Sequence, residues 1–334
     1  MNYKAVVEGK NGIVARIVAD SISEAGNRIT TFELEYHRYI HSEIMTHRLF
    51  SRNAMSSRAI PIAKMIEQVR NNPATPIHWG KNKAGMQASE ECDNLVDLGA
   101  AGVEFTPEEV WKYAAQSAAN YAEAMAEAGY HKQIVNRLLE PFQKMKTVLT
   151  ATEFDNFFWL RRDKDAQPEI HELADCMFEA MEQSQPELLK AGEYHTPYVE
   201  HFRASDVEAQ LEYIVDNVGV TVEEALAISS SCCAQVSYRL LDNSYDKAMD
   251  IYKKLLSGAK VHASPFEHQA APMEITDNEH WFTNGSIGWE DGETHVDKNG
   301  SYWSGNFKGF VQYRQTLKNH VCWEYEDKAC RLSR

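Results

Sequence analysis

The stretch from Thr46 to Arg58 constrains this chain most, because it concentrates hydrogen-bond donors in an otherwise acidic sequence. It holds three arginines, a histidine, an asparagine and three serines, and no Asp or Glu occurs between Ile44 and Ile66. Arginine forks grip phosphate or carboxylate bidentately, and small hydroxyl residues let backbone N–H groups approach the same oxygens. The fold must therefore hold this stretch where an anionic ligand reaches it. The alternative is a solvated basic loop.

Composition indicates a cytoplasmic globular protein. The chain has 334 residues, 43% of them hydrophobic and 25% charged, which suffices for one large domain or two moderate ones. No apolar signal region opens the sequence, and no run approaches membrane-spanning length. The cysteines show neither metal-site spacing nor a disulfide framework, so we expect reduced thiols at all six positions: Cys92, Cys176, Cys232, Cys233, Cys322 and Cys330.

The formal net charge of −15 bears on the kind of partner. Wrapping a nucleic-acid backbone needs an extended basic face, which an acidic chain does not favour. A mononucleotide with a single phosphate needs only a local cationic island. We therefore expect a small anionic ligand rather than a nucleic acid.

The N-terminal part is expected to be rich in strands. Residues 13–18 and 29–35 are β-branched or alternating, and the second run places Thr30, Phe32 and Leu34 on one face. Residues 36–45 are expected to form a helix leading into the donor-rich stretch.

Three histidines around that expected helix suggest a metal site, which we consider the weaker interpretation. His37 and His41 are spaced i, i+4 and would share a helical face, with His47 following. No His-Glu-x-x-His arrangement accompanies them.

Several further helices are predicted. Residues 62–69 form a short amphipathic one, and residues 73–100 a long loop of the kind that is often functional or mobile. Thr106, Pro107 and Glu109 form a capping box that opens an alanine-rich helix running to Gly129 and suited to close helix packing. Residues 169–189 are predicted to form a helix that ends near Gly192, with a core stripe of Ile170, Leu173, Ala174, Met177 and Met181.

The rest of the chain carries weaker signals. Residues 193–205 are typical of a connector, and residues 247–256 of an amphipathic helix. Hairpins are expected at Asn284-Gly285 and Asn299-Gly300, and residues 305–314 offer polar groups that could face a ligand.

The order of residues in the donor-rich stretch resembles the signature loop of the flavin-dependent thymidylate synthases. Thr46 stands where the family has the first Arg of an Arg-His-Arg triplet, which removes one cationic contact. The resemblance implies FAD contacts from His47, Arg48, Ser51 and Asn53, and contacts to the phosphate of dUMP from Ser56, Ser57 and Arg58.

A second segment resembles the family's C-terminal signature, in which an Asn precedes an Arg by five residues and Ala-Gln follows. The resemblance implies that Asn156 lies against the flavin and that Arg161 faces the uracil ring. Upstream, Thr150 and Thr152 replace the family's Asn and Arg, so part of the flavin contacts must be rebuilt. Arg137, four residues before a proline, matches a nucleotide-binding arginine of the family.

A third motif appears out of order. Residues 234–238, a helix, and residues 258–268 ending in Ser-Pro-Phe-Glu-His resemble a segment that stands before the arginine loop in the usual enzymes. A circular permutation would explain this, with residues 206–334 completing the flavin site begun by residues 1–205, either as a second portion or as one composite domain. The resemblance then implies FAD contacts from Ser237 and His268.

Each assignment has a plainer alternative. Arg137 could be an exposed helical arginine, Arg161 could pair with Asp163 or Asp165, and His268 could be a buried structural histidine. Residues 206–334 could also be an appended domain with its own core.

Taken together, the motifs imply an α+β fold with a mixed or antiparallel sheet flanked by long helices, as in this family. They imply that the protein converts dUMP to dTMP, with FAD as cofactor and with methylenetetrahydrofolate and NADPH as co-substrates. Arg161 would stabilise negative charge on the pyrimidine, and no protein nucleophile is required. A homotetramer is expected. Alternatives are a dUMP or dCMP hydroxymethylase on the same scaffold, a nucleotide- or flavin-binding protein without turnover, and a His-metal hydrolase.

Overall fold

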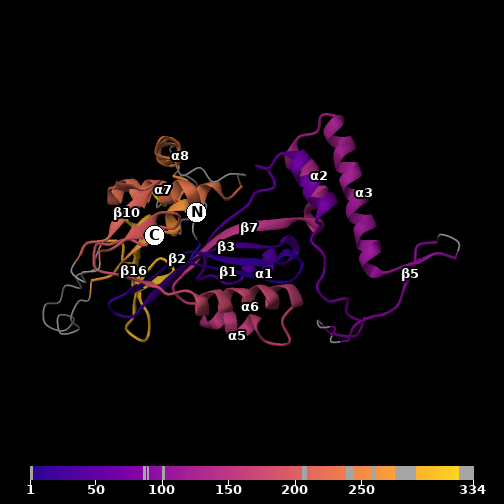
Figure 1. Cartoon of the computed structure of the whole chain (residues 1–334), viewed down its shortest axis with the longest axis horizontal. Coiled ribbons are helices and arrows are strands. Elements are labelled where there is room, and N and C mark those ends of the chain that lie inside the picture. The colour runs from indigo at the N-terminus through magenta and orange to yellow at the C-terminus, as the bar shows by residue number, and fades with distance from the viewer. Residues whose placement is uncertain are drawn as a thin grey trace, which may run out of the picture.

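The chain folds around a central antiparallel sheet to which one parallel strand is added. The computed structural model describes residues 3–85, 88, 90–99, 102–204, 209–237, 244–257, 261–274 and 291–322. The central path runs β1-β2-β3-β7-β4, and β8 pairs with β2 in parallel. The strands are β1 (Ala5–Glu8), β2 (Val14–Ser23), β3 (Arg28–His37), β4 (Ser51–Ala54), β7 (Lys144–Ala151) and β8 (Glu187–Leu189). With helices on both sides, this confirms the expected α+β class (Figure 1).

The two strands predicted near the N-terminus are confirmed, and both are longer than expected. Thr30, Phe32 and Leu34 share one face of β3, yet nearly every residue of this strand is buried. The sheet is therefore covered on both faces over β3, which explains why polar and apolar residues do not alternate cleanly there.

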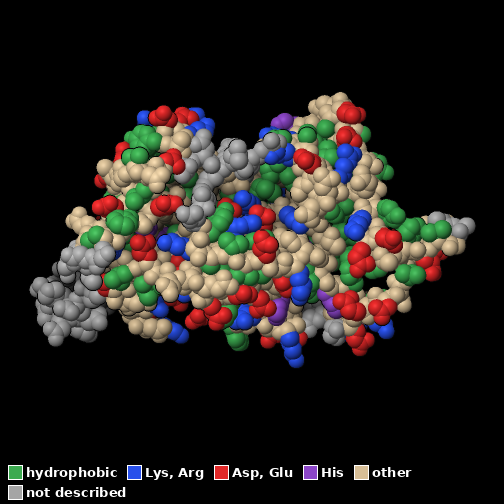
Figure 2. Space-filling view, in the orientation of Figure 1, with side chains coloured by type: hydrophobic (Ala, Val, Ile, Leu, Met, Phe, Trp, Pro, Cys, Tyr) green, Lys and Arg blue, Asp and Glu red, His purple; other side chains and the backbone are tan. Residues whose placement is uncertain are grey.

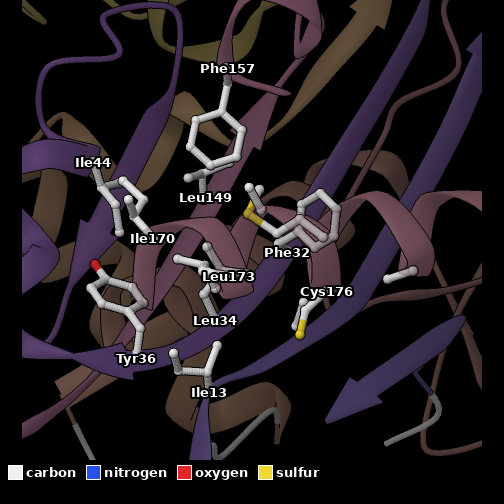
Figure 3. Close-up of a cluster of buried hydrophobic side chains, with 14 of the residues drawn as sticks. Ile13, Phe32, Leu34, Tyr36, Ile44, Leu149, Phe157, Ile170, Leu173 and Cys176 are labelled. Carbon is white, nitrogen blue, oxygen red and sulfur yellow. The ribbon is translucent and has the colours of Figure 1, made fainter. Parts of the chain in front are cut away.

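One face of the sheet packs against α5 (Asp155–Arg161) and α6 (Pro168–Gln183), which lie side by side beneath it in Figure 1. Phe32 and Leu34 from the sheet meet Leu173 of α6 and Phe157 of α5 in this core (Figure 3). The predicted core stripe of α6 is confirmed. Its predicted end is wrong, because the helix stops at Gln183 and β8 begins at Glu187. Pro186 lies between them and cannot continue a helix.

A separate layer at one end of the sheet is formed by α2 (Ile62–Asn71) and α3 (Pro107–Glu127), with the short α4 (Lys132–Val135) and the 3-10 helix η3 (Asn136–Phe142). The capping box of Thr106 and Glu109 is confirmed by both of its hydrogen bonds. Buried alanines of α3 face α2 and η3, as the alanine-rich sequence predicted. Among its described residues, the long segment between the two helices contains a bridge between Gly80 and Glu91 and the pairing of β5 (Val96–Asp97) with β6 (Glu104–Phe105).

Two local predictions before and inside the donor-rich stretch are wrong. Residues 36–45 do not form one helix, because β3 continues to His37 and is followed by a 3-10 turn, η2 (Arg38–Ile40), and a single turn, α1 (His41–Ile44). The centre of the stretch is not a loop but the edge strand β4, paired with β7. Pairing with a distant strand is a tertiary effect that a local pattern does not reveal.

The C-terminal portion packs on the opposite face of the sheet from α6. This portion, residues 206–334, adds β10 and β11 to β9 in a small sheet and contains the helices α7 and α8, a hairpin around Asn299-Gly300 as predicted, and the pair β12-β16. The bounds are β9 (Glu200–Phe202), β10 (Glu212–Val215), β11 (Val218–Val220), α7 (Val222–Ala234), η4 (Gln235–Ser237), α8 (Tyr245–Leu256), η5 (Ser264–Glu267), β12 (Ala270–Pro272), β13 (His295–Val296), β14 (Tyr302–Ser304), β15 (Phe307–Lys308), β16 (Phe310–Gln312) and α9 (Tyr313–Thr316). The other expected hairpin, at Asn284-Gly285, lies outside the described residues.

One apolar cluster joins this portion to the sheet. Val18, Ile29 and Val148 of the sheet belong to the same buried cluster as Ile228 of α7 and Phe310 of β16. Residues on the two sides of position 205 thus share a core.

Within the described residues, no helix combines the length and the apolar character needed to cross a membrane. The five cysteines in this part of the chain are free thiols. Acidic and basic side chains are interspersed over the face shown in Figure 2, without one extended basic surface.

Candidate functional site

The donor-rich stretch is pinned by one of its own arginines. The Arg52 guanidinium donates to the carbonyl oxygens of Ile44 (2.9 Å) and His47 (3.0 Å), which closes the turn before β4. Arg52 therefore has a structural task. It leaves Arg48 and Arg58 as the exposed arginines of the stretch.

Arg161 is brought onto this turn from the end of α5. Its Nη1 donates to Glu43 Oε2 at 2.7 Å, its Nε to His47 Nε2 at 3.0 Å, and its Nη2 makes a longer contact of 3.4 Å with Thr46 Oγ1. The expected alternative, a salt bridge to Asp163 or Asp165, is wrong, because the partner is Glu43. Sequence reasoning missed Glu43, which lies just before the acid-free run.

The contact with Arg161 fixes the proton of His47. An arginine N–H only donates, so His47 Nε2 must accept, and the single proton of the neutral ring then resides on Nδ1. Burial, followed by the nearby positive charges of Arg161 and Arg52, lowers the pKa of His47 to about 4. At neutral pH His47 is thus an uncharged donor whose Nδ1–H remains available to a ligand.

A large cavity opens beside the Glu43–Arg161 pair. It measures about 1260 Å³ and is lined by both of these residues, by Tyr39 and Trp111, and by His78 from the long segment after α2. A cavity with an aromatic wall and a few convergent polar groups is the usual form of a small-molecule site. The predicted long loop thus contributes to its wall.

A second group of predicted residues gathers around Glu140. Ser57 Oγ donates to Glu140 at 3.4 Å and Arg137 Nη1 at 3.2 Å. The Asn136 amide holds the turn by donating to the carbonyl of Ser57 at 2.7 Å, another contribution that the sequence did not suggest. Arg137 is exposed and forms an ion pair with Glu140. Within a single chain it therefore matches the alternative of an exposed helical arginine.

Arg48 and Arg58 differ from the other arginines. Both are exposed, and within the described ranges no ion pair or side-chain hydrogen bond of either guanidinium is recorded. A cation without an internal counter-charge is available to an external anion. Ser56 lies beside Arg58, and its hydroxyl accepts from the Arg58 backbone N–H at 3.3 Å.

The C-terminal portion contacts the other predicted flavin residues. Ser51 Oγ is buried among the amides of Asn306 and Gln312, at 3.1–3.2 Å. Asn53 donates to the carbonyl of Cys233 at the end of α7 (3.1 Å). The hydroxyl of Ser51 and the side-chain nitrogen of Asn53 are thus engaged inside the chain.

His268 follows η5, which contacts β4. It is fully buried, and its Nδ1 lies 2.8 Å from the hydroxyl of Thr150, which gives that departure from the expected motif a clear role. Within the described part of the chain, His268 Nε2 is buried without a hydrogen-bond partner. Ser237 ends η4, a segment that contacts β4 and β7.

Asn156 does not join the other candidate residues, and the three histidines considered for a metal do not converge. Asn156 is exposed on α5, and no side-chain contact of it is recorded in the described part of the chain. The three histidines considered for a metal diverge: His37 bonds Tyr39 and a backbone carbonyl, His41 bonds Tyr36, and His47 bonds Arg161. The described residues hold no group of three or more His, Cys, Asp or Glu suited to a metal ion.

His47 and His268, together with Arg48 and Arg58, fit a ligand that combines an uncharged heterocycle with a phosphate. His47 Nδ1–H is available to a ring acceptor, and the orphaned His268 Nε2 is the kind of buried polar atom that a bound group satisfies. Arg48 and Arg58 suit phosphate oxygens. A flavin nucleotide or a pyrimidine nucleotide has both kinds of group.

Comparison with known proteins gives one family match. The model of the family described as thymidylate synthase complementing protein, Thy1, matches residues 21–187. That range contains the donor-rich stretch and Arg161, and excludes Ser237 and His268. No curated protein sequence matches the chain.

Solved structures show only slight likeness. A UMP/dUMP methylase PolB from Streptomyces cacaoi is similar in its complexes with 5-Br dUMP (14% identity, TM-score 0.39) and 5-Br UMP (12%, 0.40), over 53% of this chain and 93% and 92% of those chains. A flavin dependent thymidylate synthase ThyX from Helicobacter pylori, complexed with FAD and dUMP, has 19% identity and a TM-score of 0.31, over 46% of this chain and 67% of that chain. The interpretation of the site therefore rests on the residues themselves and on the family match.

The geometry around His47 predicts its titration. Replacing Arg161 by Ala removes a positive charge and part of the cover over the ring, so the pKa of His47 should rise from about 4 toward the ordinary value near 6.5. NMR titration of the ring would measure the shift. Arg162→Ala is the matched control, because Arg162 pairs with Asp175 instead, and it should leave the pKa unchanged. An unshifted His47 in Arg161→Ala would contradict the assigned cause.

Proposed function

Because the chain belongs to the Thy1 family of thymidylate synthase complementing proteins, we propose that it is a flavin-dependent thymidylate synthase. It converts dUMP to dTMP, taking a one-carbon unit from methylenetetrahydrofolate and reducing equivalents from NADPH. FAD, when bound, supplies the redox chemistry. The tasks left to the protein are to bind, orient and tune charge.

The observation that carries this proposal is the position of Arg161. Three groups of the turn before β4 hold its guanidinium at the wall of the large cavity. A cation held in place before the reaction stabilises negative charge as it develops, without reorganisation at that moment. In the proposed reaction this charge develops on the pyrimidine ring, so we assign Arg161 as the catalytic residue.

Substrate phosphate is assigned to the exposed end of the donor-rich stretch. Arg58 has no counter-charge among the described residues, and Ser56 and Ser57 come directly before it in the chain. Arg137 is near enough to Ser57 to share Glu140 with it, which supports a place for Arg137 at the edge of the nucleotide site.

The flavin is assigned to the residues along and around β4. His47 would donate through Nδ1–H, Arg48 would meet the phosphates, and Asn156 faces outward from α5. Ser51, whose hydroxyl is engaged inside the chain, would shape the wall, and Asn53, whose side-chain nitrogen is engaged, would meet the ligand through its carbonyl oxygen. Ser237 and His268 complete this side from the C-terminal portion.

Activity of an Arg161→Ala variant tests the catalytic assignment. Loss of a preorganised charge should lower kcat by about 10²–10³-fold, in an assay that follows dTMP from dUMP with the folate donor, NADPH and FAD. The neighbouring Arg162→Ala, whose guanidinium bonds Asp175 and covers the Phe178 ring, should remain active. Near-normal turnover in a folded Arg161→Ala protein would overturn the assignment.

The same assay separates the competing activities. Mass spectrometry of the product distinguishes a methyl from a hydroxymethyl group on dUMP or dCMP. An absorption spectrum shows whether the purified protein holds flavin. Flavin binding without any pyrimidine product would favour a non-catalytic binding protein.

The phosphate assignment predicts a difference between two ligands. Arg58→Ala removes charge-assisted hydrogen bonds of about 1.5–3 kcal/mol, so the Kd for dUMP should rise roughly 10- to 150-fold while FAD affinity changes little. Arg70→Ala is the control, since Arg70 pairs with Glu123 on the helical layer. Loss of FAD affinity with unchanged dUMP binding would reverse the division of the stretch between the two ligands.

We also propose that residues 206–334 complete the site in the manner of a circular permutation. Supporting this, η5 contacts β4, His268 bonds Thr150 on β7, and Asn53 bonds the end of α7. An oligomer, a homotetramer by family resemblance, would supply any further contacts between copies.

Truncation tests the composite domain against an appended one. A chain ending at residue 205 exposes Ile29 and Val148, which pack against Ile228 and Phe310 in the full chain. It should lose cooperative thermal unfolding and FAD binding, measured by calorimetry and absorption. A truncated protein that melts cooperatively and binds FAD like the full chain would refute the permutation.

A further inference from the structure

A continuous line of hydrogen bonds crosses the buried face of the sheet beneath the C-terminal portion. Ser21 Oγ lies 2.9 Å from His195 Nδ1, and His195 Nε2 lies 2.8 Å from Thr31 Oγ1. Thr31 Oγ1 is 2.7 Å from Thr150 Oγ1, which is 2.8 Å from His268 Nδ1. The line ends at His268 Nε2, which is buried and has no hydrogen-bond partner among the residues that the structure describes.

Sheet geometry explains why these side chains meet. Thr31 of β3 is directly opposite Thr150 of β7 and also opposite Ala19 of β2, two residues from Ser21, so the three hydroxyls share one face. His195 and His268 cover that face. A backbone bridge between His195 and Ala270, two residues after His268, holds their two segments together. All five side chains are at most 1% exposed.

The unpartnered nitrogen needs a physical reason. Leaving a buried polar atom without a hydrogen bond is unfavourable, and such atoms are uncommon in native proteins. The other ring nitrogen of His268 and both nitrogens of His195 are satisfied. Of the side-chain atoms in the line, His268 Nε2 is the one that has no partner at all among the described residues.

Counting protons shows that the line has two states. Both rings are neutral near pH 7, because burial holds the pKa of His268 at about 3 and the pKa of His195 well below the ordinary value. Two neutral rings and three hydroxyls bring five protons, and four hydrogen bonds use four of them. Within the described residues neither threonine hydroxyl has a further partner, so the fifth proton belongs at one end, on His268 Nε2 or on Ser21.

The two states differ at both rings together. With the spare proton on His268 Nε2, every bond runs from Ser21 toward His268, and both rings carry their proton on Nε2. With the spare proton on Ser21, every bond is reversed, and both rings carry it on Nδ1. One line therefore couples the tautomer of His195 to that of His268 through Thr31 and Thr150.

We propose that this line is a tautomer relay that lets His268 meet its ligand as a hydrogen-bond donor or as an acceptor without changing charge, with His195 as a positioning residue. The ligand class follows from the proposed function, on which this inference rests. A flavin ring nitrogen that accepts a hydrogen bond when oxidised becomes an N–H donor when reduced. His268 Nε2 is buried in the ligand-free chain, so the proposal requires its surroundings to rearrange when the ligand binds.

Ring nitrogen chemical shifts from long-range ¹H–¹⁵N NMR report which nitrogen carries the proton. In the flavin-free full-length protein, His195 and His268 should show the same tautomer. In the FAD complex, anaerobic reduction by dithionite should shift both rings together from Nε2–H to Nδ1–H. Signals are assigned by their loss in His195→Gln and His268→Gln.

Breaking the line at its centre is the decisive variant. Thr31→Val keeps the shape of the side chain and removes the hydroxyl, so the response of His195 to flavin reduction should be lost while that of His268 remains. Thr31→Ser should restore the response of His195. Thr147→Val is the matched control, because Thr147 is another buried threonine of β7 whose hydroxyl bonds Tyr36 outside the line, and both rings should still respond.

Two results would overturn the relay. One is opposite tautomers of His195 and His268 in the wild-type protein, which needs no flavin and so applies even if Thr31→Val fails to fold. The other is an unchanged response of His195 in Thr31→Val. Failure of the protein to bind FAD would instead overturn the proposed function, while the tautomers of the flavin-free protein still test the coupling.

Discussion

The pairing of β7 with β3 on one side and β4 on the other is the constraint on which the rest of the structure depends. Thr150 of β7 is opposite Thr31 in one pair and opposite Ser51 in the other. A slip of one residue would turn Thr150 to the face covered by α6 and would separate its hydroxyl from His268. The donor-rich stretch, the buried line and the C-terminal portion are thus fixed by a single register.

Features that depend on neighbouring residues in the sequence could be predicted from it. The capping box at Thr106, the core stripe of α6 and the strands β2 and β3 are confirmed, because each depends on a local period or a local hydrogen bond. The donor-rich stretch was predicted as a loop, yet its centre is a strand, because the partner strand lies about a hundred residues away. The end of α6 was misplaced although Pro186 stands in the sequence, since apolar residues beyond it continued the apparent period.

The candidate site likewise combines residues that the sequence suggests with partners that only the tertiary structure supplies. The family resemblance points to Arg161 and His47, but only tertiary structure supplies Glu43 as the anchor of Arg161 and Asn136 as the support of the Ser57 turn. Thr150, which appeared from the sequence as a lost contact, has gained a buried hydrogen-bonding role. Partners of this kind come from segments far apart in the chain, so no local pattern reveals them.

The arginines around the candidate site differ in whether they have a partner within this acidic chain. Arg161 pairs with Glu43, Arg137 shares Glu140 with Arg38, and Arg52 donates to backbone carbonyls. Arg48 and Arg58 have no such compensation among the described residues, although the protein carries 49 acidic side chains. These two arginines gain no stabilisation from an ion pair within the described chain. An external anion that binds them therefore meets no internal competitor.

The two histidines assigned to the flavin differ in one physical respect, the chemistry of the neighbour on the far side of the ring. His47 is bonded by an arginine, which only donates, and its proton is therefore fixed on Nδ1. His268 is bonded by a threonine hydroxyl, which donates or accepts, so its proton is free to move between the two nitrogens. A fixed donor suits a ligand atom whose hydrogen-bonding sense is constant. A reversible contact suits an atom whose sense changes with its redox state, and the protein offers one of each around the same strand.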